Sequence, residues 1–134
     1  MKYLLDTNII IHYIRMKPSS VAEKINGLGD DAAPCMSFIT YAELLKGAER
    51  STRKAEVIRN LELLSGLIQV NYDISGAICG QYARHSSKLK ASGRQIGAND
   101  LWIACHALSL DMTLVTNNVR EFERIEGLRI ENWA

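Results

Sequence analysis

Short runs of consecutive apolar residues alternate along the chain with longer stretches in which apolar residues recur every three or four positions. The short runs are typical of strands buried on both faces of a parallel sheet. The longer stretches are typical of amphipathic helices that cover such a sheet. The first run, Tyr3–Leu5, starts almost at the first residue and is followed at once by Asp6 and then by a helical pattern that reaches Ile14.

This alternation predicts a complete set of elements. We expect strands at residues 3–5, 33–38, 67–70, 113–116 and 128–131. We expect helices at residues 8–16, 20–28, 40–48, 51–64, 75–93, 99–110 and 119–125. Since strands and helices alternate without a repeat or linker, the chain predicts one α/β domain over residues 1–134, with a four- to five-stranded parallel sheet flanked by helices and joined by right-handed crossovers.

Acidic residues fall where predicted strands give way to helices. Asp6 follows the first strand, Glu43 lies shortly after the second, Asp100 lies at the start of a later helix, and Glu121 follows the fourth strand. In a parallel sheet, strand-to-helix junctions share one edge, and ligands bind in the crevice there. We therefore expect these four carboxylates to approach one another although they are far apart in sequence.

Each acid also has a purely structural explanation. Asp6 and Asp100 suit the start of a helix, where a carboxylate accepts hydrogen bonds from free N–H groups. Thr40 and Glu43 match a capping box, and Glu121 could be a solvated helix charge. Several acids at one edge are harder to explain in this way, so both interpretations are kept for each residue.

A cluster of carboxylates has a definite chemical consequence. Neighbouring carboxylates repel one another and raise each other's pKa, and a divalent cation removes that conflict. Ligands that are all oxygen favour Mg²⁺ or Mn²⁺ over zinc. Such a metal binds phosphate oxygens and activates water, which is the chemistry of phosphodiester hydrolysis.

Charge and cysteine content limit the kinds of binding partner and the cellular compartment that we expect. A net charge of +1 gives no overall attraction for nucleic acid, so RNA binding would depend on a local basic patch. Candidates for phosphate contacts are Arg15, Lys17, Lys46, Arg50, Arg84, Lys88, Lys90 and Arg94. No apolar run is long enough to span a membrane, and the three cysteines lack the spacing of a zinc site or disulfide framework. We expect a cytoplasmic protein with free thiols and no membrane contact.

Four segments, in order, resemble the PIN domain and, more closely, the VapC toxins of bacterial toxin–antitoxin pairs. They are LLDTNIIIHYI, SFITYAELLKGA, IGANDLWIACHALSL and LVTNNVREFERIEGLRIENW, and together they cover nearly the whole chain. The resemblance implies a metal-dependent endoribonuclease in which Asp6, Glu43 and Asp100 bind Mg²⁺ or Mn²⁺. It implies an RNA substrate with a tRNA anticodon stem-loop favoured, a VapB-type antitoxin, a homodimer, and contact with operator DNA only through the antitoxin.

One position departs from the family pattern. Many relatives carry a fourth Asp where this chain has Asn118, and Glu121, one helical turn later, is the candidate replacement. We expect Glu121 to assist catalysis, and we expect orienting roles for the residues around the acids. Those residues are Thr7, Asn8, Thr116 and Asn118.

Three further expectations complete the prediction. We expect His12, His85 and His106 to be structural or surface residues rather than acid–base groups. An apparent excess of apolar residues near the predicted site indicates a protein interface. It comprises Ile9, Ile10, Tyr13, Tyr41, Leu44 and Leu45. The alternative functions are a catalytically inert module that binds a protein partner and, less well matched, an aspartate-based phosphotransfer domain, for which the chain lacks the D-x-D motif.

Overall fold

The computed structural model describes residues 2–134 and contains one sheet of five parallel strands. The strands are β1 (Tyr3–Leu5), β2 (Pro34–Ser37), β3 (Gln69–Asn71), β4 (Thr113–Val115) and β5 (Ile130–Glu131), in the spatial order β3-β2-β1-β4-β5. The predicted parallel α/β architecture is therefore confirmed, and the sheet has the larger of the two expected strand numbers.

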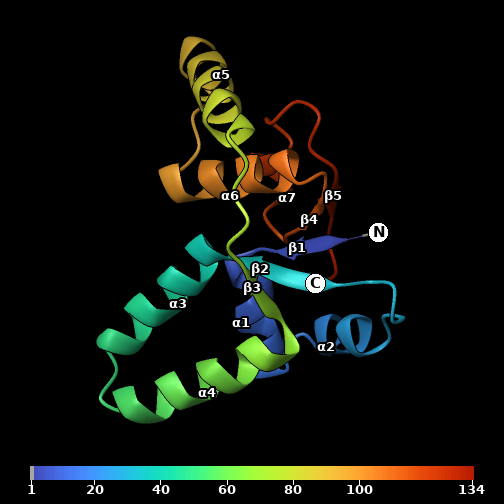
Figure 1. Ribbon diagram of the computed structural model, residues 1–134, viewed down its shortest axis with the longest axis vertical. Coiled ribbons are helices and arrows are strands. Elements are labelled where there is room, and N and C mark those ends of the chain that lie inside the picture. The colour runs from blue at the N-terminus through green and yellow to red at the C-terminus, as the bar shows by residue number, and fades with distance from the viewer. Residues whose placement is uncertain (1) are drawn as a thin grey trace.

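Seven helices cover the two faces of the sheet in the described part of the chain (Figure 1). They are α1 (Thr7–Arg15), α2 (Ser19–Asn26), α3 (Phe38–Glu49), α4 (Lys54–Leu67), α5 (Ala77–Ala91), α6 (Ala98–Ser109) and α7 (Val119–Phe122). Helices α1–α4 contribute to one hydrophobic core and α5–α7 to the other, so the sheet is the middle layer of three.

Successive residues of the central strands face opposite cores. Leu4 and Leu114 belong to the core on the α5–α7 side, and Leu5 and Val115 belong to the core on the α1–α4 side. All four side chains are fully buried. This two-sided burial explains why the strands are uninterrupted apolar runs rather than alternating ones.

The central strand β1 lies where the strand order reverses. The chain continues from β1 outward to β2 and β3, then crosses over to β4 on the other side of β1. The Asp6 backbone N–H donates to the Val115 carbonyl at 2.8 Å, directly beyond the paired strands. Asp6 therefore lies at the topological switch point, where the crevice of an open α/β sheet forms.

Two predicted helix starts differ from the observed ones because of local hydrogen bonds. Helix α3 begins at Phe38 because Ser37 accepts a hydrogen bond from the Ile39 N–H at 3.1 Å. Thr40 thus lies inside the helix, and its predicted capping box with Glu43 does not form. Helix α4 begins three residues later than expected, after a turn in which the Ser51 hydroxyl accepts from the Arg53 N–H.

Part of the apolar excess predicted as an interface is core. Ile9 and Ile10 are fully buried against α3 and α4 residues of the same cluster, so they are not interface residues. Cys35 and Cys105 are buried free thiols and Cys79 is an exposed one, as the cysteine spacing predicts. Among residues 2–134, no helix has the length and apolar character needed to cross a membrane.

Candidate active site

Asp6 uses its two carboxylate oxygens for different partners. Oδ1 accepts from the Thr7 backbone N–H at 2.8 Å and caps α1, while Oδ2 accepts from the Thr116 hydroxyl at 2.8 Å. The Thr116 oxygen in turn accepts from the Asn118 N–H at 3.0 Å, which fixes its orientation. Asp6 is thus both a helix cap and a carboxylate held in the crevice between β1 and β4, with only 4% of its surface exposed.

Burial and neighbouring charge act together on Asp6. Burial, the largest influence, raises the pKa of the carboxyl group above its usual range. The hydrogen bonds from Thr116 and Thr7 oppose that change, and the negative charges of Glu43 and Glu121 add to it. The net effect is a raised pKa, so the ionised form of Asp6 lacks sufficient positive compensation in its surroundings.

Asp100 lies in the first turn of α6, and the same acids affect its pKa. Burial, followed by the charges of Asp6, Glu121 and Glu43, raises its pKa to about 6. Asp100 forms no side-chain hydrogen bond or ion pair with any other residue of 2–134. Asp100 thus combines a raised pKa with a side chain that no partner restrains.

Glu43 is tied to the start of α1. Thr7 Oγ1 donates to Glu43 Oε1 at 2.8 Å, and the same hydroxyl lies 3.1 Å from Thr40 Oγ1. Thr7 therefore connects α1 to α3, the helix that carries Glu43. This contact gives the predicted orienting role of Thr7 a geometric basis, and the role stays a prediction.

Asn118 and Glu121 lie at the same site as a hydrogen-bonded pair. Asn118 Nδ2 donates to Glu121 Oε2 at 2.9 Å. The charge of Glu121 raises the pKa of both Asp6 and Asp100, so Glu121 belongs electrostatically to the cluster rather than to a solvated helix surface. Asn8 is exposed and forms no side-chain hydrogen bond within the described residues, so its orienting role stays a prediction.

The four acids form a site of concentrated negative charge. None of them forms an ion pair with Lys or Arg in the described part of the chain. Within residues 2–134 no three His, Cys, Asp or Glu side chains lie close enough together to hold a metal ion as they stand. The donor set nevertheless fits a hard divalent cation, because it consists of carboxylate oxygens, and the pKa values of Asp6 and Asp100 are raised in the absence of a compensating positive charge. Binding would require the carboxylates to move closer to one another.

The sequence did not reveal one contact that supports the site. His106, fully buried, has Nε2 2.8 Å from the Asp73 carbonyl and Nδ1 2.9 Å from the Ser37 hydroxyl. Since a carbonyl only accepts, Nε2 carries the proton and the neutral Nδ1 accepts from Ser37. His106 therefore braces the residue that caps α3. The available signal was the residue type of Ser37, which favours helix caps, although it falls inside the predicted strand 33–38.

Comparison with known proteins agrees with the geometry. The model of the PIN domain family matches residues 3–128. The chain is 48% identical over 134 residues to Ribonuclease VapC1 of Haemophilus influenzae strain R2866, covering 100% of this chain and 99% of the relative. It is 40% identical over 138 residues to the tRNA(fMet)-specific endonuclease VapC of Shigella flexneri, covering 100% and 99%.

Solved structures show the same likeness. The structure of VapBC-1 from nontypeable Haemophilus influenzae matches with a TM-score of 0.92 and 48% identity, covering 99% of this chain and 98% of that one. VapBC2 from Rickettsia felis, bound to a DNA fragment from its promoter, matches with a TM-score of 0.91 and 35% identity, with complete coverage of both chains. The likeness extends over the whole domain rather than over one motif.

Proposed function

The chain belongs to the PIN-domain family, among the VapC proteins, and we propose that it is a metal-dependent endoribonuclease that acts as the toxin of a toxin–antitoxin pair. The observation that carries the proposal is the electrostatic coupling of four acids at the switch point of the sheet. Burial and the charges of Asp6, Glu121 and Glu43 raise the pKa of Asp100, although the four acids come from separate parts of the chain. A fold can stabilise such a charge cluster through a bound cation.

We propose Asp6, Glu43 and Asp100 as the residues that would hold Mg²⁺ or Mn²⁺, with Glu121 as an auxiliary acid. When bound, the metal supplies an activated water and offsets the charge that develops on the phosphodiester oxygens. Oxygen-only donors support these metals rather than zinc. This chain has Asn118 where many relatives have Asp, but the cluster still contains four acids, because Glu121 supplies a negative charge from the next helical turn.

The neighbouring polar residues support this role by holding the acids. Thr116 and Thr7 each donate to Asp6, and the Thr7 hydroxyl also donates to Glu43. Asn118 holds Glu121. Asp100 is left free of partners, so it can turn toward a cation without breaking a hydrogen bond. With a pKa of about 6, it is mostly ionised at neutral pH.

We propose tRNA as the substrate, cut in the anticodon stem-loop to leave 5′-phosphate and 3′-hydroxyl ends. The name of the Shigella flexneri relative, a tRNA(fMet)-specific endonuclease, supports this substrate class. Loops also leave bases and backbone accessible, unlike paired helices. Sequencing the 5′ ends of cellular RNA after brief induction of the protein tests the proposal. It predicts new ends in a tRNA anticodon loop, and an unchanged RNA population contradicts it.

We propose that the antitoxin docks an apolar helix in a groove between α1 and α4. The groove has a volume of about 430 Å³, and Leu63 and Leu67 on its rim are 74% and 71% exposed. Its lining comprises Tyr13, Ile14, Met16, Val57, Asn60, Leu61, Leu63, Leu64 and Leu67. The similar VapBC complexes support an antitoxin partner, and their DNA-bound forms support contact with operator DNA through it.

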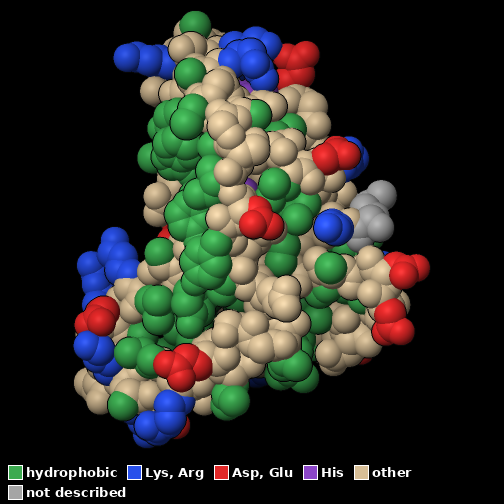
Figure 2. Space-filling model, viewed as in Figure 1, with side chains coloured by type: hydrophobic (Ala, Val, Ile, Leu, Met, Phe, Trp, Pro, Cys, Tyr) green, Lys and Arg blue, Asp and Glu red, His purple; other side chains and the backbone are tan. Residues whose placement is uncertain are grey.

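We also propose a homodimer. Figure 2 shows hydrophobic side chains gathered in a band that runs from α5 to α3 on one face of the molecule. Tyr72 and Ile74, in the segment between β3 and α5, are 65% and 54% exposed, and Tyr72 stacks on Phe38 with ring centroids 6.5 Å apart. A second copy covering this surface would bury it. A monomer at micromolar concentration in sedimentation experiments would contradict the dimer.

A further inference from the structure

A cavity opens directly beside Glu43. It has a volume of about 240 Å³ and is lined by Glu43, Lys46, Gly47, Arg50 and Asn99. Lys46 and Arg50 follow Glu43 by about one and two turns of α3, so they share its face. Asn99 precedes Asp100 in the first turn of α6. The cavity therefore lies between the two helices that carry acids of the candidate site.

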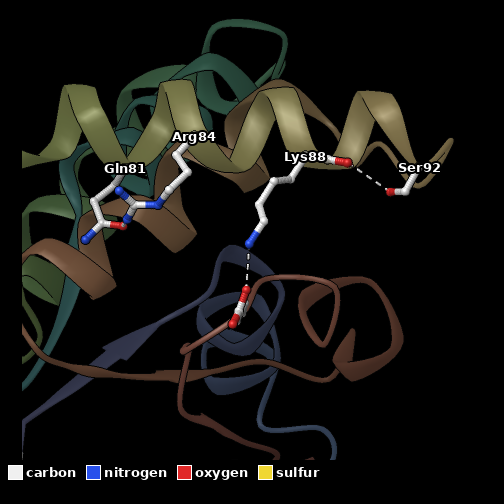
Figure 3. Close-up of polar contacts among 5 residues, drawn as sticks. Gln81, Arg84, Lys88 and Ser92 are labelled. Atoms are coloured by element: carbon white, nitrogen blue, oxygen red, sulfur yellow. Dashed lines mark hydrogen bonds and ion pairs between the residues drawn. The ribbon is translucent and has the colours of Figure 1, made fainter.

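The two cations of this cavity have no partners in the described protein. Lys46 and Arg50 form no side-chain hydrogen bond or ion pair with any residue of 2–134, and Glu43 is engaged by Thr7 instead. Two of the other candidate cations already have side-chain partners. On α5, Arg84 donates to Gln81 at 2.6 Å and Lys88 pairs with Glu126 at 2.7 Å (Figure 3).

An acidic site that acts on RNA must overcome repulsion between its carboxylates and the polyanionic backbone. Cations that are free and line the same cavity as Glu43 provide that compensation. Arg can grip a phosphate through two parallel N–H groups, and Lys adds a mobile point charge. The Asn99 side-chain amide supplies a neutral donor at the cavity's other wall.

We propose that Lys46 and Arg50 form a subsite for an RNA backbone phosphate adjacent to the one that is cleaved. This inference rests on the proposed ribonuclease function. It adds a binding surface that aligns the RNA strand across the acidic site. Lys46 and Arg50 are positioning residues here, because they bind a phosphate that does not react. Their loss should raise KM and weaken binding, with a much smaller effect on kcat.

Substitutions at Gly47 provide a second test of the cavity. A Cβ atom added there meets no atom within 4 Å, so a side chain at this position enters open space. Replacing glycine inside a helix also favours folding. Gly47→Glu would place a negative charge among the cations, and Gly47→Gln would add nearly the same volume without charge. This matched pair separates electrostatic repulsion from simple obstruction.

The experiment measures binding of a fluorescein-labelled tRNA transcript by anisotropy in EDTA, at several salt concentrations. The variants are Lys46→Gln/Arg50→Gln, Gly47→Glu and Gly47→Gln. The control Lys2→Gln/Arg59→Gln removes the same charges from the amino end of β1 and from α4. Thermal melting verifies that each variant is folded. Parallel cleavage assays with Mn²⁺ separate kcat from KM.

The subsite predicts about tenfold or greater loss of affinity in Lys46→Gln/Arg50→Gln, and a salt slope reduced by roughly 0.7 for the lost phosphate contact. Gly47→Glu should weaken binding far more than Gly47→Gln, and the control pair should bind nearly as the wild type does. Equal binding by wild type and Lys46→Gln/Arg50→Gln, an equal loss in the control pair, or no measurable binding by wild type would each overturn the subsite. Wild-type protein that binds RNA but never cleaves it overturns only the ribonuclease function.

Discussion

The Thr116 hydroxyl donates to Asp6 Oδ2 at 2.8 Å and so joins the ends of the two neighbouring strands β4 and β1. This hydrogen bond lowers the pKa of Asp6 against the opposing effect of burial. Thr116 itself is fully buried, and its oxygen accepts from the Asn118 N–H. One hydroxyl thus favours the ionised form of the central carboxylate, against the larger effect of burial, and fixes its direction.

Thr116→Val should therefore weaken metal binding without removing any acid. The valine has a similar shape but cannot donate, so the pKa of Asp6 should rise further and its orientation should loosen. Loss of a partner that orients a ligand typically costs roughly 10- to 100-fold in metal affinity or activity. Mn²⁺ titrations of cleavage should show a higher half-maximal concentration and recovery at saturating metal. An unchanged titration would exclude this role of Thr116.

Asp100 should make the stability of the metal-free protein depend on pH. Its folded-state pKa of about 6 lies above the ordinary value of 3.8, so the folded protein binds this proton more tightly than the unfolded chain does. The stabilising effect is complete below the ordinary pKa and is lost as pH rises through about 6.

Asp100→Asn should remove that dependence. At pH 8 the variant should be more stable than wild type by about 1 kcal/mol, after discounting the pKa shift for solvent screening. The difference should vanish below about pH 4. Urea unfolding in EDTA across this range measures it. A variant less stable than wild type at pH 8 would show that the Asp100 carboxylate is not under electrostatic strain.

Asn118→Asp should replace a hydrogen bond by a repulsion. Asn118 Nδ2 now donates to Glu121 Oε2 at 2.9 Å, and an aspartate there would face Glu121 as a like charge. The metal-free variant should be less stable, and metal should raise its melting temperature by more than in wild type. Its cleavage should need less Mn²⁺, because a further carboxylate would be present at the site.

Glu121→Gln provides the matching variant. Because the charge of Glu121 raises the pKa of both Asp6 and Asp100, its loss should lower activity and increase the Mn²⁺ requirement. Asn118→Asp should partly restore both in the double variant. If Glu121 is only a surface charge, its removal should change cleavage by no more than about twofold. Unchanged metal dependence in both single variants would show that three acids suffice.

Leu63→Glu/Leu67→Glu should abolish antitoxin binding while leaving the fold intact. Both side chains are mostly exposed on the rim of the groove between α1 and α4, so charge there costs little in the free protein. The control Glu62→Gln changes a neighbouring exposed residue of α4. Co-purification with a co-expressed VapB-type antitoxin reports the outcome. Full retention of the antitoxin by Leu63→Glu/Leu67→Glu would place the interface elsewhere.

Much of the fold follows from the sequence because local pattern and tertiary environment agree. The strand Tyr3–Leu5 is apolar throughout because Leu4 and Leu5 enter different cores, and the order of elements permits only parallel pairing with crossovers. The junction acids were found from the same topology. Helix starts were less predictable, since Ser37 and Thr40 are both good caps and only the packed structure selects Ser37.

Other features depend on contacts between distant residues and leave no local pattern. The hydrogen bond that Ser37 donates to His106 spans 69 positions, and a buried histidine on an apolar helix does not indicate its partner. Ile9 and Ile10 looked like interface residues because an apolar pattern does not reveal how many elements pack on it. The cavity beside Lys46 and Arg50 likewise depends on how α3 lies against α6.

The most direct test of the proposed function is cleavage of a tRNA transcript by purified wild-type protein and by Asp6→Asn, each assayed in EDTA and in Mn²⁺. Asp6 is buried and its carboxyl pKa is raised, so the neutral asparagine should leave the fold intact and relieve repulsion. We predict cleavage only by wild type and only with Mn²⁺, while thermal melting shows both proteins folded. Cleavage by wild type that continues unchanged in EDTA, or by Asp6→Asn at the wild-type rate, would contradict a metal-dependent nuclease built on this acidic site.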